Sequence, residues 1–335
     1  MVIALLATIF AVTPACASDA AASDAAPQHD ATTDAATDAP AGDSATQPPA
    51  LQAAPVDPNT VPTVDFDGVV GPDSPDFDLE VLYHEGHLQE GLKKARAELA
   101  AHPHDVNLHV QVARFMFEIG EHIKRDDKSI DKKAWYEEMI RVSQDGLKLK
   151  PGDPHLEFAL GIAYARLGTT RGVLSSLFLA KDVEQAWLAA ANSDFRYSSL
   201  GVEEMLPCDA YMSLGVFYRL VPDWWIVKVL AGTRGDLDKS LSELIAADQC
   251  FPGRISVVKE LGVTQECIGV KRREPEMVEK GKATLARGLA MSIVTKSDRL
   301  DARDSKMLIE HPENACGYSR DGEQDLDEKK LDTGN

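Results

Sequence analysis

The chain has 335 residues and a formal net charge of −19. Eleven acidic residues and no Lys or Arg lie between Asp19 and Asp76, so much of the acidity belongs to the N-terminal stretch. An acidic chain without a basic stripe excludes a nucleic-acid-binding role, because phosphates require clustered Lys and Arg. Gly and Pro fall mostly between periodic segments, and no long alternating run indicates a sheet, so the sequence predicts an all-α protein.

The N-terminal residues indicate export. Residues 2–12 form an apolar run that is too short to span a bilayer but suits the core of a signal peptide. Ala15 and Ala17 fit cleavage before Ser18, which makes 1–17 the predicted signal peptide. Alternatively, Cys16 resembles the acylated first residue of a bacterial lipoprotein. Both readings predict an exported protein, either free in the periplasm or anchored to the outer membrane.

Two segments are predicted to lack a packed core. Residues 18–77 are rich in Ala, Asp, Thr and Pro, and such a composition buries too little apolar surface to offset chain entropy. We expect this range to be a disordered linker, and 310–335 to be a disordered acidic tail. The range between them, 78–309, is the predicted folded domain.

Four proline-containing stops divide that domain, around Pro103, Pro151, Pro207 and Pro252. Each stop is expected to close one helix and open the next, with Asp at the capping position in three of them. Apolar stripes at helical spacing lie on both sides of each stop. A helix pair of this kind buries its apolar face only by stacking on a neighbour, so the pattern predicts an α-solenoid of antiparallel helix pairs with long inserts.

The stretch from Leu206 to Gly253 is the clearest of these pairs. One predicted helix carries an apolar face that includes Leu214 and Tyr218, and the second, started by Asp236, carries a face formed by Leu237, Leu241, Leu244 and Ile245. The tripeptide Arg234-Gly235-Asp236 between them is explained as a turn followed by a helix cap.

Two apolar inserts are the candidate functional surfaces. Trp224 and Trp225 are adjacent in the insert 221–232, so one helical face cannot bury both of them. The insert 172–179, which contains Phe178, has the same character. Each insert either fills the core, which is the commoner role of such residues, or binds an apolar ligand or partner segment. The candidate ligand- or partner-binding residues are Tyr164, Phe178, Tyr218, Trp224 and Trp225.

The repeat pattern also has a family resemblance. Pro-x-Asp stops followed by Leu-Gly, and the run Asp236-Leu237-Asp238-Lys239-Ser240-Leu241, resemble tetratricopeptide repeats. Residues 217–222 followed by 235–239 resemble the T component of TRAP transporters and, more distantly, the regulators of microtubule dynamics. The first resemblance implies an exported protein that holds a hydrophobic solute or a solute-binding partner.

Four cysteines follow Cys16, and none of them forms a C-x-x-C motif. Cys208 begins one helix of the central pair and Cys250 ends the other, so antiparallel packing brings them to the same end. We therefore predict the disulfides Cys208–Cys250 and Cys267–Cys316 in an oxidising compartment. Buried free thiols are the alternative.

Motifs for catalysis and metal binding are missing from the sequence. His84 and His87 lie in His-Glu-Gly-His, which has the wrong spacing for a zinc protease, and no nucleophile or phosphate-loop signature occurs. We therefore expect no metal and no cofactor.

The sequence thus predicts a non-catalytic, exported helical scaffold that binds a protein partner or a hydrophobic small ligand. The first alternative is an accessory subunit of a TRAP-type solute transporter. The second is a hydrolase with dispersed catalytic residues.

Overall fold

A computed structural model describes residues 68–70, 74–123, 129–172, 174–199, 202–293 and 296–320. The predicted signal peptide with Cys16, most of the predicted linker and residues 321–335 lie outside this description. Within it, none of the helices is long and apolar enough to cross a membrane.

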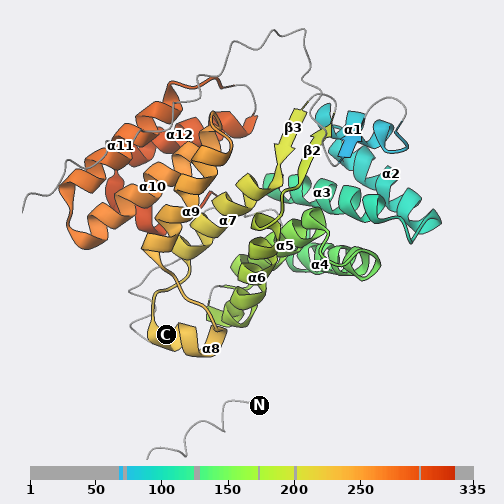
Figure 1. The fold of residues 1–335 in the computed structure, drawn as a ribbon, viewed down its shortest axis with the longest axis horizontal. Coiled ribbons are helices and arrows are strands. Elements are labelled where there is room, and N and C mark those ends of the chain that lie inside the picture. The colour runs from blue at the N-terminus through green and yellow to red at the C-terminus, as the bar shows by residue number, and fades with distance from the viewer. Residues whose placement is uncertain are drawn as a thin grey trace, which may run out of the picture. The chain divides into compact units, whose positions relative to one another are not determined.

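The described chain is built almost entirely from helices, with one small sheet (Figure 1). In chain order the elements are β1 (Gly68–Val70), α1 (Phe77–His84), α2 (Leu88–Ala101), α3 (Val106–His122), α4 (Lys132–Leu149), α5 (Pro154–Arg171), the 3-10 helix η1 (Leu174–Leu179), α6 (Ala180–Ala191), β2 (Arg196–Ser199), β3 (Val202–Met205), α7 (Leu206–Leu220), α8 (Trp225–Ala231), α9 (Leu237–Cys250), α10 (Ile255–Arg272), α11 (Pro275–Leu289), α12 (Lys296–Glu310) and the 3-10 helix η2 (Pro312–Gly317).

Helices that follow one another in sequence pack on one another. The series runs from α2 through α7, continues from α7 to α9, and then passes through α10 to α11 and α12 (Figure 1). Asp105 and Asp153 cap α3 and α5 by accepting hydrogen bonds from backbone amides of the first turn, as predicted for two of the stops. The all-α solenoid of stacked helix pairs is therefore confirmed.

The central pair, α7 and α9, has the predicted form. Leu214 and Leu244 are fully buried between its helices, and Gly215 lets α9 approach closely, since a Cβ there would lie 2.4 Å from Leu244 Cγ. The Ser240 hydroxyl donates to the Gly215 carbonyl at 2.7 Å. Gly235 is required where the chain returns past α7, because a Cβ at this residue would lie 1.9 Å from the Val221 oxygen.

The small sheet was not predicted. β1 pairs in parallel with β2, and β2 pairs antiparallel with β3. The sheet corrects two predictions. The prediction of a disordered linker over 18–77 is wrong at its C-terminal end, because residues 68–70 form a strand. The prediction that the third stop closes a helix is also wrong, because this stop follows strand β3. Asp209 accordingly lies within the first turn of α7, where it pairs with Arg254.

A buried carboxylate ties this sheet to the first helices. Glu80 of α1 accepts hydrogen bonds from Arg114 at 2.7 Å, from the Tyr197 hydroxyl at 2.6 Å and from Gln111. Arg114 also lies over the Tyr83 ring at 4.4 Å. Because a buried charge needs several partners, this network fixes α1, α3 and β2 together.

The C-terminal end of the fold extends beyond the predicted boundary. Residues 312–317 form η2, which packs on α10, and Tyr318 is buried. The prediction of a disordered tail is therefore wrong for 310–320. The reason is that this short segment is held by contacts with residues far away in sequence, which its own composition does not reveal.

Candidate functional site

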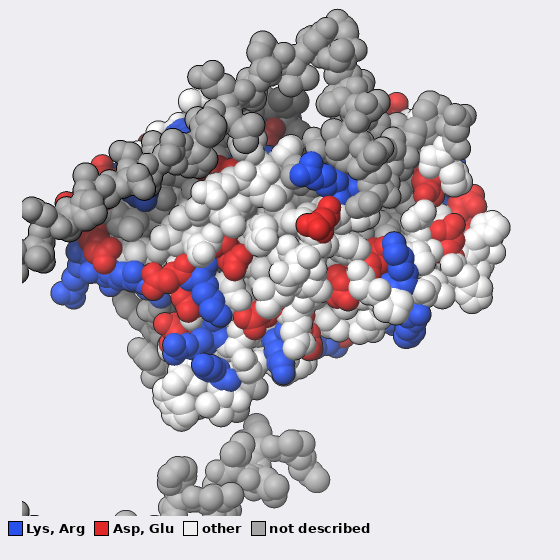
Figure 2. Space-filling model, in the orientation of Figure 1, with Lys and Arg blue, Asp and Glu red and all other residues white. Residues whose placement is uncertain are grey.

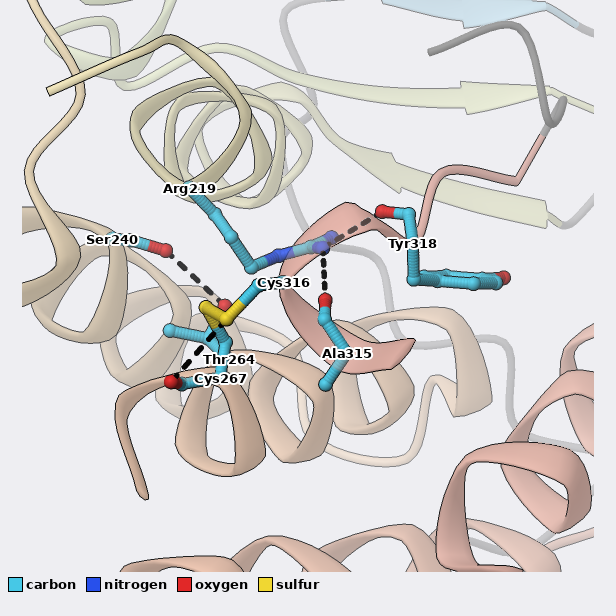
Figure 3. The surroundings of a disulfide bond; sticks show 7 residues. All are labelled: Arg219, Ser240, Thr264, Cys267, Ala315, Cys316 and Tyr318. Atoms are coloured by element: carbon cyan, nitrogen blue, oxygen red, sulfur yellow. Dashed lines mark hydrogen bonds between the residues drawn. A yellow bond between two sulfur atoms is a disulfide. The ribbon is translucent and has the colours of Figure 1, made fainter. Parts of the chain in front are cut away.

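Both predicted disulfides are present in the structure. Cys208–Cys250 joins the ends of α7 and α9 with a Cα–Cα distance of 5.5 Å, and Cys267–Cys316 joins α10 to η2 with a Cα–Cα distance of 4.6 Å. The first closes the central pair at one end, and the second holds η2 against α10 (Figure 3). They stabilise the scaffold that carries the candidate sites.

The first candidate site is an exposed apolar surface formed by the two inserts. We define the insert surface as four side chains: Phe178 of η1, Trp224 directly before α8, and Trp225 and Val229 in α8. Their exposed fractions are 61% for Phe178, 38% for Trp224, 72% for Trp225 and 70% for Val229. The two elements pack on each other, so these side chains belong to one region of the molecule. In Figure 2 the surface over α8, at the lower edge, is mostly white, with Lys and Arg side chains beside it.

The opposite face of α8 is part of the core. Val227 and Ala231 are buried and belong to the main apolar cluster. The inner face of the insert therefore fills the core, whereas its outer face is exposed. Core filling alone does not account for Trp225, which is 72% exposed.

Two of the sequence candidates lie elsewhere. Tyr218 is buried, and its hydroxyl donates to Glu184 at 2.6 Å; burial and this carboxylate raise the pKa of Tyr218 well above its usual range. Tyr164 is half-buried, and its hydroxyl accepts a hydrogen bond from Gln144 at 2.9 Å. The structure thus gathers Phe178, Trp224 and Trp225 but separates Tyr164 and Tyr218 from the open surface.

A second candidate site was missed by sequence reasoning. A cleft of about 480 Å³ lies between the start of α2, the end of α3 and Ile130, which shortly precedes α4. We call it the first-pair cleft. Apolar side chains form much of its wall, and histidine, glutamine and glutamate side chains lie beside them; it is lined by Gly86, His87, Leu88, Gln89, Glu90, Ile119, His122, Ile123 and Ile130.

The first-pair cleft depends on a turn and a helix end. Gly86 adopts a left-handed conformation with φ of 79°, which reverses the chain between α1 and α2 and places His87 and Leu88 at the rim. Ile119 lies in the last turn of α3, and Ile123, four residues later, is the residue at which the helix ends. This spacing was the one signal in the sequence that could have indicated this cleft.

The strongest electrostatic interactions lie in the interior and away from both sites. Lys259 donates to Asp301 at 2.8 Å and to the Tyr318 hydroxyl at 3.0 Å, and it also pairs with Glu260 at 2.9 Å. Burial alone would lower the pKa of Lys259, but Glu260, Tyr318 and Asp301 together raise it. Burial would likewise raise the pKa of Glu260, but Lys259 and Arg219 lower it. Both groups are therefore held in their charged forms.

The Arg219 guanidinium extends this buried cluster. It donates to the carbonyl oxygens of Ala315 and Tyr318, at 3.1 and 2.8 Å (Figure 3). It also donates to Glu260 at 2.6 Å. These bonds fix the C-terminal segment against α7 and α10. The cluster consists of paired charges that hold secondary elements together, which is a structural arrangement.

His109 and His84 have local partners. His109 is buried between the carbonyl oxygens of Val142 and Pro103, at 3.0 and 3.2 Å, and His84 lies 3.8 Å from Glu80. Among the residues that the structure describes, no group of three or more His, Cys, Asp and Glu side chains could hold a metal ion.

Comparisons with known proteins add little to this picture. No protein-family model matches the chain, and no curated protein matches it. A solved structure described as "MamA RS-1 ArsTM double mutant" aligns with 63% of this chain and 90% of that chain, at 15% identity and a TM-score of 0.37. Similarity at that level supports no argument, so the conclusions below rest on the chain itself.

Proposed function

We propose that this protein is an exported, non-catalytic helical scaffold that binds a segment of a protein partner in the first-pair cleft. The observation that carries the proposal is the cleft itself, with Leu88, Ile119, Ile123 and Ile130 as apolar contacts and Glu90 and two histidines beside them. Apolar walls with a few polar groups suit a side-chain-bearing peptide segment, because the walls supply affinity and the polar groups fix orientation.

Two features support export. Disulfides persist in oxidising compartments, and the structure contains two of them. The apolar run 2–12 followed by Cys16 and a linker suits a lipoprotein leader, which would keep the scaffold at the periplasmic face of a membrane.

The distribution of titratable groups supports a non-catalytic role. A reaction centre usually gathers groups with shifted pKa values in an accessible cleft. Here Lys259 and Glu260, whose pKa values are shifted, are buried and paired with each other and with Asp301 and Arg219. Neither of them lines the first-pair cleft.

An accessory role in TRAP-type solute transport is the alternative that the sequence resemblance implies. A cavity for a hydrophobic solute would favour that role, and the space beneath the insert 221–232 is the place to expect it. The inner face of α8 instead packs into the apolar core through Val227 and Ala231. This packing favours the protein-binding role.

Site-specific photocrosslinking in the exporting cell tests the proposal. A photoreactive amino acid at Ile130, which lines the cleft and is half-buried, should yield a discrete crosslinked species containing one other protein. The same group at Ile245, an exposed position on α9, is the control and should yield none. An Ile130 variant that is exported at the normal level but gives no crosslink would contradict the proposal.

A further inference from the structure

The insert surface exposes more apolar area than a solvated loop requires. Trp225, Val229 and Phe178 are each more than half exposed, and they come from two inserts far apart in sequence that pack on each other. Isolated apolar residues are common on protein surfaces, but a contiguous group of large ones indicates a contact surface.

The residue types at this surface suit one environment in particular. Tryptophan prefers the interface between lipid hydrocarbon and water, because its ring is amphipathic. Two adjacent tryptophans stand at the start of α8, where Trp224 is the residue before the first helical turn. Valine and phenylalanine beside them supply apolar area that enters the same layer.

Charged residues of both signs lie beside the insert surface, and two of them are exposed lysines. Lys228 is exposed on α8, and the Lys181 side chain lies beside Gly232 at the end of that helix. Arg234 pairs with Asp223 at 3.3 Å, and Asp182 follows Lys181. Lysine and arginine can extend their apolar stems along a lipid surface while keeping the charge in water. Although the chain as a whole has a net charge of −19, Lys228 and Lys181 place positive charge beside the insert surface, where it can contact anionic lipid headgroups.

We propose that the insert surface docks on a lipid membrane surface, with Trp225, Val229 and Phe178 entering the interfacial layer. This inference goes beyond the protein-binding role and uses a different part of the molecule from the first-pair cleft. The two sites therefore allow one scaffold to rest on a membrane while it holds a partner.

The geometry supports shallow insertion. The helix α8 has 7 residues and is about 10 Å long, and Trp225 and Val229, four residues apart, lie on the same side of it, so the helix can lie flat in the interfacial layer. In Figure 1 it lies at the lower edge of the described chain, beyond the ends of α6 and α9. Its inner face is anchored by Val227 and Ala231, and Gly232 ends it in a left-handed conformation with its amide donating to Lys228 at 3.0 Å. Because α8 is held in place in this way, less conformational entropy is lost when the insert surface docks.

The test uses the full chain and vesicles that contain acyl-brominated lipids, which quench tryptophans in contact with them. The vesicles are phosphatidylethanolamine mixed with phosphatidylglycerol. The four tryptophans are Trp135, Trp187, Trp224 and Trp225, so the apolar leader contains none and cannot mimic the signal. Trp187 is buried and Trp135 is half-buried, whereas Trp225 is 72% exposed. We expect the emission of the exposed tryptophans to shift to shorter wavelength and to be quenched.

Variants locate the contact. Trp224→Ser with Trp225→Ser should abolish quenching, and Val229→Ser with Phe178→Ser should weaken the vesicle partition constant at least roughly tenfold. Lys228→Gln should weaken binding to the anionic vesicles roughly fivefold and leave binding to phosphatidylcholine vesicles unchanged. Leu149→Ser, which removes an exposed apolar side chain from the end of α4, is the matched control and should change nothing.

Two results would overturn the proposal. One is an unquenched wild-type chain on both kinds of vesicle, which would leave the insert surface to a protein or to a second copy of the chain. The other is equal quenching and partition of the Val229→Ser/Phe178→Ser variant and wild type. Far-ultraviolet circular dichroism of each variant verifies the fold, which should persist because the substituted side chains are exposed.

Discussion

The two ends of the described chain use the same helix-pair architecture but are stabilised by different interactions. The region from α1 to α8 encloses a large apolar cluster that includes Phe115, Met116 and Met139, each fully buried. The region from α10 to η2 has a small apolar cluster, formed by Val263, Cys267, Leu285, Leu308, Ala315 and Tyr318. Both regions contain buried charges, close glycine contacts and a disulfide cysteine, but the second has the smaller apolar cluster and more buried ion pairs, namely Lys259 with Asp301 and with Glu260, and Arg219 with Glu260.

The difference follows from the position of α10. This helix packs against α7, α9, α11, α12 and η2, so almost all of its length is buried. A helix buried on all sides is normally apolar, yet three ionisable side chains of α10 are buried: Lys259, Glu260 and Glu266. Each buried charge must then be paired, and this requirement fixes which elements pack around the helix.

The largest expected effect comes from breaking the buried pair of Lys259 and Asp301. Lys259→Ala leaves Asp301 buried without a cation and leaves Glu260 paired with Arg219 alone, so we expect the free energy of unfolding to fall by about 3–5 kcal/mol. Denaturant unfolding measures the loss. Arg272→Ala, which removes an exposed pair with Asp238, is the control and should cost less than about 1 kcal/mol. Equal losses would mean that the buried charges do not distinguish the two regions.

Removing the second disulfide should affect the C-terminal region alone. Cys267→Ala with Cys316→Ala opens a link between residues separated by 49 positions, and we expect a loss of about 2–4 kcal/mol. Hydrogen exchange should show lost protection in α12 and η2 and unchanged protection in α3 and α5. Uniform deprotection across the chain would contradict the division into two differently stabilised regions.

Glycine contacts between α10 and α11 give a smaller and more local effect. A Cβ at Gly281 would lie 2.5 Å from Glu266 Cγ and 2.8 Å from the Gly262 oxygen, so Gly281→Ala forces the helices apart. We expect a loss of about 1–3 kcal/mol, measured by thermal unfolding. Gly288→Ala on the same helix is the matched control, because its nearest neighbour would be Val258 Cγ1 at 3.3 Å, and it should be close to neutral.

These regions also differ in how far the sequence predicted them. Helix spacing and the Pro-containing stops predicted the central pair, and the antiparallel ends of its helices predicted Cys208–Cys250, because both depend on nearby residues. Ile245 is exposed although the periodic pattern placed it on the buried face of α9, since the neighbouring helix covers Ser240, Leu244 and Ala247 instead. Propensity and period describe one helix, whereas burial depends on which helix lies opposite.

Long-range partners account for most of what the sequence did not indicate. The residues that Arg219 binds in η2 and directly after it are 96 and 99 positions away, and a buried arginine has no signature in its own segment. β1 and β2 pair across more than a hundred residues, and strands of 3 and 4 residues are too short for an alternating pattern. The insert surface could be proposed from the apolar residues of the two inserts. The first-pair cleft could not, because it forms only where the turn at Gly86 and the end of α3 lie together in the folded chain.

The smallest expected effect concerns Glu266, which faces Gly281 and has no hydrogen-bond partner for either carboxylate oxygen among the described residues. Burial raises the pKa of Glu266 to about 8, and Lys282 opposes this shift. The ordinary pKa of this carboxyl group is 4.5, so between these two values the folded chain holds a proton that the unfolded chain has released. The free energy of unfolding should therefore fall as pH rises through this window.

Glu266→Gln removes the titration, so the stability of this variant relative to wild type should increase by about 1–2 kcal/mol between pH 5 and pH 9, a value reduced for solvent screening. Denaturant unfolding at several pH values measures the difference. Parallel curves for the two proteins would mean that Glu266 is solvated in the folded state and that burial does not raise its pKa.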